Sequence, residues 1–441
     1  MGRGVVRKPE HYPNHLWKLA ALTFMAFVTV ALAATAVANT SKGNRRGKSH
    51  NGGVVGAFYT QTNTPTGNGV VWFARSANGQ LTEKAIIATD GKGASGTPPF
   101  DFPIVDGSGS VNLGSNGHLL FVVNAGDNTV SSFRVANSGR PTLVDHVSSG
   151  GTLPVSLTSN GHLLYVVNEG TSSSSGNIYG YRISNSGHLT PLGSSQTLNT
   201  LGPIGTAADP AEIDFSPNGH ALVVTIRDTA QRSTGAIDTF SVGQNGKAGP
   251  ATVISASAPN PFGFSFAGQA HVEVSHAGTV SAIPPNVADP TQFVGSASTY
   301  DLSGSTKLKA AGAPVASGAR AACWLVVTSN NKYAFVTNTL SDTVADAGTG
   351  KGAVSRYKVA PGGTLTLLGQ VSTGPPVGGP TFPSDMALSD GSRYLYVIEP
   401  TVMAGNTSHV DVYKVGSGGS LTLIQSSPGD LARGISGAAA R

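Results

Sequence analysis

A repeated unit of short apolar segments constrains the fold of this chain more than any other feature. Residues 116–126 read NGHLLFVVNAG and residues 160–170 read NGHLLYVVNEG, so nine of eleven positions are identical at a spacing of 44 residues. In both copies an apolar segment precedes the Asn-Gly pair, and two more segments follow. Asn-Gly and Ser-Gly pairs supply the positive φ that tight hairpins need. The repeat therefore predicts antiparallel strands joined by short turns.

The same unit recurs through the rest of the chain, with four predicted strands in each copy. Its first segment appears six times, at intervals of about 44 to 61 residues. The six copies are SVNLGSNG at 110, PVSLTSNG at 154, PAEIDFSPNG at 210, PFGFSFAGQ at 261, ACWLVVTSNN at 322 and PSDMALSDG at 383. This period is typical of a β-propeller. A parallel β-helix is the alternative, but its rungs are shorter and lack paired hairpin turns.

The two ends of the repeat region complement each other. Residues 54–60, 69–75 and 81–87 read as second, third and fourth strands, whereas residues 434–441 (GISGAAAR) resemble a first segment. One blade built from both ends would close the ring and remove exposed sheet edges. We therefore expect an all-β fold over residues 54–441, a seven-bladed propeller of four-stranded antiparallel blades closed by pairing of N- and C-terminal strands.

The N-terminal residues form a separate region. Residues 1–18 are basic, residues 19–38 carry no charge, and this apolar run ends in Ala36-Val37-Ala38. That order predicts a secretory signal over residues 1–38. The alternative is an uncleaved anchor, because twenty uncharged residues can span a bilayer. Residues 39–53 are polar, basic and Gly-rich, which indicates a flexible linker. Both alternatives place the propeller outside the cytoplasm, either secreted or membrane-anchored.

The positive net charge of the chain comes from its N-terminal end. The whole chain has a formal charge of +5, but residues 54–441 hold 20 Lys and Arg against 22 Asp and Glu. The folded part therefore gives no electrostatic reason to expect nucleic acid as a partner. The four linker bases are weak support for contact with an anionic membrane.

The single cysteine, Cys323, excludes an intrachain disulfide. Cys323 lies in the apolar run AACWLVV, so we expect a buried and unreactive thiol. No Cys and His spacing for zinc, no nucleophile elbow and no phosphate loop is present. We expect neither a metal nor another cofactor.

Several phrases resemble the seven-bladed lactonase-like propellers, a family typified by propeller-type 6-phosphogluconolactonase and fungal carboxymuconate lactonizing enzymes. The phrases are LLFVVNAGDNTVSSFRV, DPAEIDFSPNG, PFGFSF, AACWLVVTSNNKYAFVTNT and MALSDGSRYLYV. They resemble above all the exported bacterial members called lactonase family proteins or carboxymuconate cyclases, over roughly residues 54–441. The resemblance is a strong indication of fold and a weak one of activity, because unrelated functions share propellers.

The resemblance also implies a set of reactive residues. These are a His after the proline of an inner strand, a Glu that ends a neighbouring second strand, and Arg residues facing the central channel. Arg would hold a carboxylate or phosphate, and His or Glu would transfer protons. Here the positions after the prolines hold Val155, Ala211, Phe262 and Ser384, whereas Glu169 in VVNEGT is the best match to the Glu. The set is not intact, so whether the chain is an enzyme stays open.

Acidic residues of the predicted innermost strands are the first candidates for chemistry. Glu212 and Asp214 alternate in PAEIDF and should face the same side, and Asp385 holds the equivalent place in PSDM. Acids around one channel can bind a cation or a sugar, or act as an acid–base pair. Their alternative role is structural, as polar groups that line the channel and hydrogen-bond the backbone. We choose Glu212 and Asp385 as catalytic candidates and Asp214 as a ligand-binding candidate.

Residues that follow the predicted second strands should gather towards one rim of the ring. These are Glu169, Arg227, His276 and Glu399. We choose Glu399 as a third catalytic candidate and the other three as ligand-binding candidates. Their alternative role is that of solvated loop residues, since loops are generally polar.

Two functions fit this pattern. The first is a lactonase or cycloisomerase that acts on a lactone or small cyclic ester in the mouth of the channel. The second is a non-catalytic extracellular propeller that binds a small molecule, a polysaccharide or a surface protein. In both cases we expect a monomer that contacts a membrane only through residues 19–38, if these are not cleaved.

Overall fold

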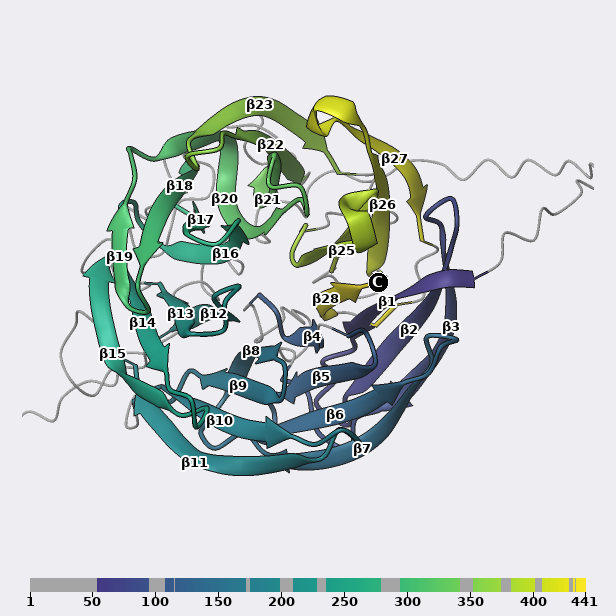
Figure 1. Cartoon of the computed structure of the whole chain (residues 1–441). Coiled ribbons are helices and arrows are strands. Elements are labelled where there is room, and N and C mark those ends of the chain that lie inside the picture. Colours follow the sequence, from purple (N-terminus) through teal and green to yellow (C-terminus); the bar gives the residue numbers. More distant parts are fainter. Residues whose placement is uncertain are drawn as a thin grey trace, which may run out of the picture.

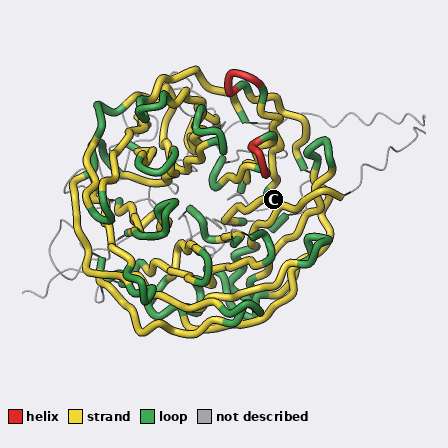
Figure 2. The backbone as a smooth tube through the Cα atoms, in the orientation of Figure 1, coloured by secondary structure: helices red, strands yellow, loops and turns green. Residues whose placement is uncertain are grey.

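The computed structural model describes most of the chain from residue 54 onwards. The described ranges are 54–94, 108–114, 116–171, 175–198, 209–227, 235–278, 294–341, 352–373, 382–400, 407–427, 431–432 and 434–441. Their regular structure is β-strand apart from two 3-10 helices, η2 (Asp390–Ser392) and η3 (Ser417–Gly419), which are the red turns in Figure 2. A helix long and apolar enough to cross a membrane does not occur in these ranges. The predicted signal or anchor and the linker, residues 1–53, lie outside them.

Seven four-stranded antiparallel blades form a closed ring (Figure 1), which confirms the predicted fold. Numbered along the ring and written from the inner to the outer strand, blade 1 is β28 (Ser436–Ala440), β1 (Val54–Gln61), β2 (Gly69–Ser76) and β3 (Leu81–Ala88); blade 2 is β4 (Val111–Leu113), β5 (Leu119–Asn124), β6 (Thr129–Val135) and β7 (Pro141–Ser148); blade 3 is β8 (Pro154–Asn160), β9 (Leu163–Asn168), β10 (Asn177–Ile183) and β11 (Leu189–Thr197); blade 4 is β12 (Pro210–Phe215), β13 (Ala221–Ile226), β14 (Ala236–Val242) and β15 (Ala248–Ser255). Blade 5 is β16 (Pro261–Ala267), β17 (His271–His276), β18 (Val294–Ser303) and β19 (Lys307–Ala310); blade 6 is β20 (Val315–Val327), β21 (Tyr333–Ser341), β22 (Ala353–Val359) and β23 (Leu365–Ser372); blade 7 is β24 (Met386–Leu388), β25 (Tyr394–Glu399), β26 (His409–Val415) and β27 (Leu421–Ser426).

The ring is closed by the two ends of the described chain, as the sequence predicts. β28 pairs with β1 in the register Phe58↔Ala440 and Tyr59↔Ala439, so the C-terminal strand is the innermost strand of blade 1. The Arg441 guanidinium donates hydrogen bonds of 2.9 to 3.1 Å to the carbonyl oxygens of Gly117, Ala136 and Asn137 in blade 2. This residue therefore ties blade 1 to blade 2 in addition to closing the sheet.

The inner strand of blade 6 is longer than the sequence indicates. β20 begins at Val315, whereas the repeated segment begins at 322. Its first part pairs with β18 of blade 5, in the register Ser296↔Ala316 and Ala297↔Val315. Blades 5 and 6 are thus joined into one continuous sheet by a segment that the repeat does not contain.

The apolar core lies between neighbouring blades. The second strands are buried along most of their length, because both faces of a blade are covered and the strand can be apolar throughout. In β9, for example, Leu164, Tyr165, Val166 and Val167 are all fully buried. Cys323 is buried in a core cluster with residues of blades 4 to 7, which confirms the predicted buried thiol.

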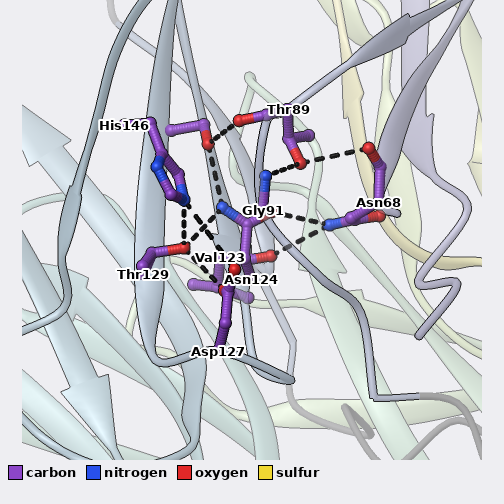
Figure 3. A network of polar contacts seen from close by, with 9 residues as sticks. Asn68, Thr89, Gly91, Val123, Asn124, Asp127, Thr129 and His146 are labelled. Carbon is purple, nitrogen blue, oxygen red and sulfur yellow. Dashed lines mark hydrogen bonds and ion pairs between the residues drawn. The ribbon is translucent and has the colours of Figure 1, made fainter. Parts of the chain in front are cut away.

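Polar side chains join neighbouring blades where the second strands end, as blade 2 illustrates (Figure 3). Asn124 is the last residue of β5 and accepts a hydrogen bond from Asn68 of blade 1 at 2.9 Å. It donates to Ser131 Oγ at 2.8 Å, and Ser131 donates to the Thr89 carbonyl oxygen at 2.6 Å. The repeated Asn of the VVN phrase is therefore a structural link between blades.

Blade 6 repeats this arrangement. Asn338 donates to Ser355 Oγ at 2.8 Å, and Ser355 donates to the carbonyl oxygen of Ser317 at 2.8 Å. The sixth residue of the second strand and the third residue of the third strand are therefore a neutral amide and a hydroxyl in both blades.

Candidate functional site

One face of the ring carries the start of every first strand and the end of every second strand, because all blades run in the same order from inside to outside. We call it the mouth face. Of the seven predicted site residues, Glu212 and Asp385 lie near the start of first strands, and Asp214 lies two residues further along β12. The other four end or follow second strands of blades 3, 4, 5 and 7, namely Glu169, Arg227, His276 and Glu399.

Glu212 and Asp385 are held at the ring axis by the free edges of inner strands. An innermost strand has one edge without a neighbouring strand, so its N–H groups need other acceptors. Glu212 Oε2 accepts the N–H of Phe264 in blade 5 at 2.6 Å. Asp385 Oδ2 accepts the N–H of Ala438 in blade 1 at 3.2 Å. Each carboxylate thus joins its own blade to the next one.

A short stretch of chain ahead of β4, residues 108–110, lies across the ring axis between these two carboxyls. We call it the crossing segment; it is the blue stretch that leads to β4 inside the ring in Figure 1. Its Gly109 N–H donates to Asp385 Oδ2 at 3.0 Å, and its Ser108 N–H donates to the Ala211 carbonyl oxygen at 2.8 Å. Gly109 has φ of +70°, a conformation that favours glycine.

The crossing segment also contacts three other blades. Its Gly109 carbonyl oxygen accepts the N–H of Leu157 in blade 3 at 3.1 Å, and Ser110 Oγ accepts a hydrogen bond from Gln61 in blade 1 at 3.0 Å. The carbonyl oxygen of Ser110 accepts the N–H of Val123 in blade 2 at 3.1 Å. With Asp385 of blade 7 and Ala211 of blade 4, these bonds fix the segment to five of the blades.

Burial at the ring axis raises the pKa values of both carboxyls. Desolvation raises the pKa of Asp385 to about 7, against the opposing effect of three backbone N–H donors. Desolvation also raises the pKa of Glu212 well above its usual range, and the neighbouring charges of Asp214 and Asp385 raise it further. Burial thus disfavours the charged form of both carboxyls, and Asp385 titrates near neutral pH. Carboxyls whose pKa values are raised towards neutrality are suited to proton transfer at physiological pH.

Asp214 links blades 3 and 4. Its Oδ1 accepts hydrogen bonds from Thr158 Oγ1 at 2.6 Å and from the Phe215 N–H at 2.8 Å. Desolvation raises its pKa to about 6. Asp214 and Glu212 are electrostatically coupled, but their hydrogen bonds go to different blades.

Arg227 is packed among aromatic and acidic neighbours at the mouth face. Its guanidinium is ion-paired with Asp209 and lies 4.8 Å from the ring centre of Phe262. The Phe262 ring in turn packs against Trp324 of blade 6, at 4.8 Å between ring centres. Phe262 occupies one of the positions after an inner-strand proline, so an aromatic ring stands where the resemblance implies a His.

His276 and Glu169 differ in burial. His276 is fully buried, and desolvation lowers its pKa to about 3, so its ring is neutral at physiological pH. Glu169 is half-buried, and its backbone N–H donates to the Leu153 carbonyl oxygen at 2.9 Å. A neutral imidazole can accept a proton only under strongly acidic conditions, which makes His276 a poor base at neutral pH.

Glu399 does not join the carboxyls at the ring axis. It lies directly across from His409 on β26, and the register places Val397 and Asp411 on the same face of the blade. Val397 belongs to a core cluster that contains residues of blade 6 and none of blade 1, so this face points towards blade 6. Glu399, His409 and Asp411 are all fully buried, and we call them the blade 7 cluster.

The blade 7 cluster has its own hydrogen bonds. Asp411 accepts hydrogen bonds from Ser426 Oγ at 2.6 Å and from the Tyr413 hydroxyl at 3.1 Å. His409 Nε2 lies 3.5 Å from Asp411 Oδ1, and desolvation lowers the pKa of His409 while Asp411 opposes that shift. Within the described residues no group of His, Cys, Asp and Glu has the geometry to hold a metal ion.

Sequence reasoning did not select Ser108, His409 or Asp411. Ser108 carried no signal, because the stretch that contains it reads as the start of an ordinary first segment. A comparison of the third strands would have identified His409 and Asp411. HVDVYKV has Asp411 where TVSSFRV has Ser131 and AVSRYKV has Ser355, and it begins with His409.

A surface cavity of about 550 Å³ lies on the face opposite the mouth face. It is lined by Val54, Val55, Leu113, Asp390, Arg441 and neighbouring residues of blades 1, 2 and 7. None of the predicted site residues lines it, so it is separate from the carboxyls at the ring axis.

The fold and these residues define a class of protein, a seven-bladed propeller with buried carboxyls around its axis. Within that class, the chain belongs to the family described as lactonase, 7-bladed beta-propeller, which matches residues 66–200 and 154–435. A comparison with curated proteins gave no match.

Three solved structures illustrate the similarity in fold. A candidate 6-phosphogluconolactonase from Bacteroides fragilis is 17% identical, with a TM-score of 0.62 over 88% of this chain and 98% of that chain. A candidate 6-phosphogluconolactonase from Bacteroides uniformis is 15% identical, with a TM-score of 0.62 over 88% of this chain and 99% of that chain. A protein from Lactobacillus plantarum has the same identity, TM-score and coverage as the second. At these identities the likeness shows the fold alone.

Proposed function

We propose that this protein hydrolyses the ring ester of a small lactone at the ring axis, with Glu212 and Asp385 as its acid–base pair. The observation that carries the proposal is the pair of buried carboxyls from blades 4 and 7 that accept backbone N–H groups at the ring axis and influence each other electrostatically. Membership of the lactonase family supports the reaction type.

The reaction needs one proton acceptor and one proton donor. The ionised carboxyl, Asp385, takes a proton from the attacking water as its oxygen bonds to the lactone carbonyl carbon. The ring C–O bond then breaks, and the protonated carboxyl, Glu212, donates a proton to the oxygen that leaves. The product is a hydroxy acid, and a solvent proton exchange restores the two carboxyls.

A sugar lactone without phosphate is the substrate class that we favour. Two structural neighbours are described as candidate 6-phosphogluconolactonases, which supports a sugar-acid lactone. Phosphate binding usually relies on Arg or Lys with free donors. Arg227, the cation that we predicted at the mouth face, is ion-paired with Asp209.

A second candidate function is non-catalytic binding of a small molecule. It is supported by the hydrogen bonds of Asp385, whose oxygens accept from the backbone N–H groups of Gly109, Met386 and Ala438. Such bonds are sufficient to explain a buried carboxylate structurally.

Release of acid from a panel of lactones separates the two functions. The panel should contain D-glucono-1,5-lactone, its 6-phosphate and an unsubstituted aliphatic lactone, with the spontaneous rate subtracted. We expect turnover of the unphosphorylated sugar lactone, lost in the double variant Glu212→Gln/Asp385→Asn. Absence of turnover with saturable binding would favour the second function, and turnover that survives in the folded double variant would refute our assignment of the site.

We also propose that the protein is exported, on the basis of residues 1–38 alone. Expression of the full chain in a bacterial host, followed by fractionation and mass measurement, tests this. We expect extracytoplasmic protein that begins after Ala38. Protein that keeps Met1 and stays in the membrane fraction would favour the anchor instead.

A further inference from the structure

A side chain of each blade donates a hydrogen bond to the outer turn of the next blade. The acceptor is a backbone carbonyl oxygen in the turn between the third and fourth strands, and we call these contacts the rim bonds. Their donors and acceptors, in ring order, are Tyr59 and Gly139, Ser132 and Gly187, Tyr165 and Gly246, Thr239 and Thr306, Thr299 and Gly363, Arg356 and Gly419, and Tyr396 and Gly79. The rim bonds thus join neighbouring blades far from the ring axis.

The rim bond between blades 5 and 6 has a buried carboxyl behind it. Glu273 is the third residue of β17 and is fully buried. The third residues of the second strands in blades 2, 3, 4, 6 and 7 are apolar or aromatic, namely Phe121, Tyr165, Val223, Phe335 and Tyr396. Burial of an acid costs free energy that burial of an apolar residue does not. An acid at this position therefore indicates a role beyond packing.

The hydroxyl of Thr299 lies between two oxygen atoms. Thr299 is directly across from Glu273 in blade 5. Its Oγ1 lies 2.7 Å from Glu273 Oε2 and 2.5 Å from the carbonyl oxygen of Gly363 in blade 6. A threonine hydroxyl has one proton to donate, and a carbonyl oxygen can only accept. Both contacts are hydrogen bonds at the same time only when Glu273 is protonated and donates to Thr299, which then donates to Gly363.

The surroundings of Glu273 favour its protonated form. Within the part of the chain that the structure describes, Glu273 Oε1 has no hydrogen-bond partner. An ionised carboxylate in a protein interior needs donors at its oxygens. Burial raises the pKa of Glu273 to about 8, the hydrogen bond with Thr299 opposes this shift, and the charge of Asp301 adds to it.

The other titratable groups around this contact lie in blades 5 and 6. His271 Nδ1 is 2.8 Å from Asp301 Oδ1, and Lys309 is directly across from Asp301 on β19. His271 also lies against Gly363. In blade 6, Tyr357 belongs to the core, and burial raises the pKa of its hydroxyl. Asp301 and Lys309 are exposed to solvent, whereas Glu273 is not, so burial distinguishes Glu273 from these charged neighbours.

We propose that Glu273 is a proton-dependent switch of the contact between blades 5 and 6. The protonated carboxyl completes the chain of hydrogen bonds from Glu273 through Thr299 to Gly363. The ionised carboxylate takes the hydroxyl proton of Thr299 as its own hydrogen bond, so the Gly363 carbonyl oxygen loses its donor and the turn is released. None of these residues lies at the ring axis, so the switch is independent of the proposed function.

The direction of the pH effect follows from the raised pKa. The folded protein holds this proton more tightly than the unfolded chain, whose carboxyl has the usual pKa of 4.5. The stabilising effect of the bond is therefore complete at acid pH and is lost as the pH rises from 4.5 to about 8. Mildly alkaline conditions should release the rim bond while the other blade interfaces stay closed.

Hydrogen exchange of the intact protein tests the release of the turn. The N–H groups of Ala360 and Gly363 donate within the Gly363 turn, and those of Ser184 and Gly187 donate in the same way within the turn that Ser132 holds. After correction for the intrinsic pH dependence of exchange, we expect protection of the Gly363 turn to fall about tenfold between about pH 6 and about pH 9. The Gly187 turn should keep its protection. Wild-type protein that keeps full protection of the Gly363 turn at about pH 9 would overturn the proposal, and this comparison needs no variant to fold.

Two variants locate the effect at the carboxyl and the hydroxyl. The amide of Glu273→Gln can donate to Thr299 at any pH, so we expect protection of the Gly363 turn at both pH values. Thr299→Val removes the hydroxyl, so we expect low protection at both. Loss of protection in Glu273→Gln equal to that of the wild type would show that another group titrates and would refute the assignment to Glu273.

Infrared spectroscopy tests the proton itself. A protonated buried carboxyl has a C=O stretching band that an ionised carboxylate lacks. We expect the difference spectrum of wild type minus Glu273→Gln to contain this band at about pH 6 and to lose it by about pH 9. A difference spectrum without the band at about pH 6 would show that Glu273 is already ionised, which contradicts the proposal.

Discussion

The carboxyls at the ring axis and the blade 7 cluster consist of the same residue types, but the molecule holds them in different ways. Glu212 and Asp385 accept backbone N–H groups from neighbouring blades, and the crossing segment lies between them. Glu399 and Asp411 lie inside one interface, with side-chain donors from their own blade around Asp411. The first group therefore accepts backbone donors from neighbouring blades, whereas Asp411 in the second accepts hydroxyl groups of its own blade.

Blade 2 provides the neutral form of the position that the blade 7 cluster fills. Asn124 and Ser131 stand in blade 2 where Glu399 and Asp411 stand in blade 7. In Figure 3, Asn124 lies at the centre of a continuous hydrogen-bonded network that reaches Asn68 on one side and Thr129 on the other. A neutral pair is thus sufficient to join two blades, and burial of charged groups in place of it generally costs stability.

Replacement of one carboxyl in each group by a neutral amide should distinguish the two groups most clearly. Glu212→Gln removes the proton transfer but keeps the shape, so we expect turnover of lactone to fall by about 10²- to 10⁴-fold. The matched variant Glu399→Gln should stay within about threefold, because Glu399 faces blade 6 rather than the ring axis. Steady-state kinetics of both purified variants provides the measurement. An equal loss in the two variants would show that both groups take part in catalysis.

Asp385→Asn should destabilise the ring more than Asp411→Asn. Asp385 accepts three backbone N–H groups, which an amide NH₂ cannot do. We expect a loss of about 3 kcal/mol for Asp385→Asn, since hydrogen bonds to a charged group contribute about 1.5–3 kcal/mol. Asp411 accepts from two hydroxyls that can rotate, and we expect a loss of about 1 kcal/mol. Urea unfolding of both variants tests the order, and the reverse order would contradict it.

The two groups should also respond to pH in opposite directions. The pKa of Asp385 is raised to about 7 from its usual 3.8, so the folded state keeps this proton longer and stability falls as pH rises between about 4 and 7. The pKa of His409 is lowered by burial, so the unfolded state binds protons more readily and stability falls as pH drops below about 6.5.

Removing one titrating group at a time should flatten one side of the stability profile. We expect His409→Gln to reduce the acid-side loss and Asp385→Asn to reduce the loss towards neutral pH. Unfolding free energies at several pH values provide the measurement, with the slope rather than the absolute value compared. A steeper acid-side slope in His409→Gln would contradict the sign.

The smallest effect should come from the neutral link in blade 2. Asn124→Ala leaves Asn68 and Ser131 without one hydrogen bond each, and we expect a loss of about 1–2 kcal/mol. Turnover should be unchanged, because this link lies at a blade interface. A loss of turnover at constant stability would show that the link also shapes the site.

Most of the fold could be predicted from the sequence, because each blade of a propeller repeats the same order of strands and turns. The Gly turns and apolar segments recur in each blade, and the short segment near Arg441 could only be a missing first strand. The extension of β20 to Val315 could not be predicted, since it pairs with β18 of another blade and follows no repeat. Pairing between blades is a property of the assembled ring.

The candidate site could be predicted only in part. Glu212 and Asp385 were recognised as charged residues in inner strands, and the structure brings them into electrostatic contact. Nothing in the sequence indicated that residues 108–110 cross the axis, because their contacts lie in five blades that are distant along the chain. The sequence around Glu399 did not reveal which side of the blade this residue faces. Both sides of a blade are buried, so apolar residues occupy both faces of the strand and polar residues do not mark one of them.

A crystal structure of the Glu212→Gln variant soaked with D-glucono-1,5-lactone would test the central claim most directly. We predict a lactone or its acid at the ring axis, with an oxygen within hydrogen-bond distance of Asp385. Ligand bound in the blade 7 interface, or in the cavity beside Arg441 with the ring axis empty, would contradict it.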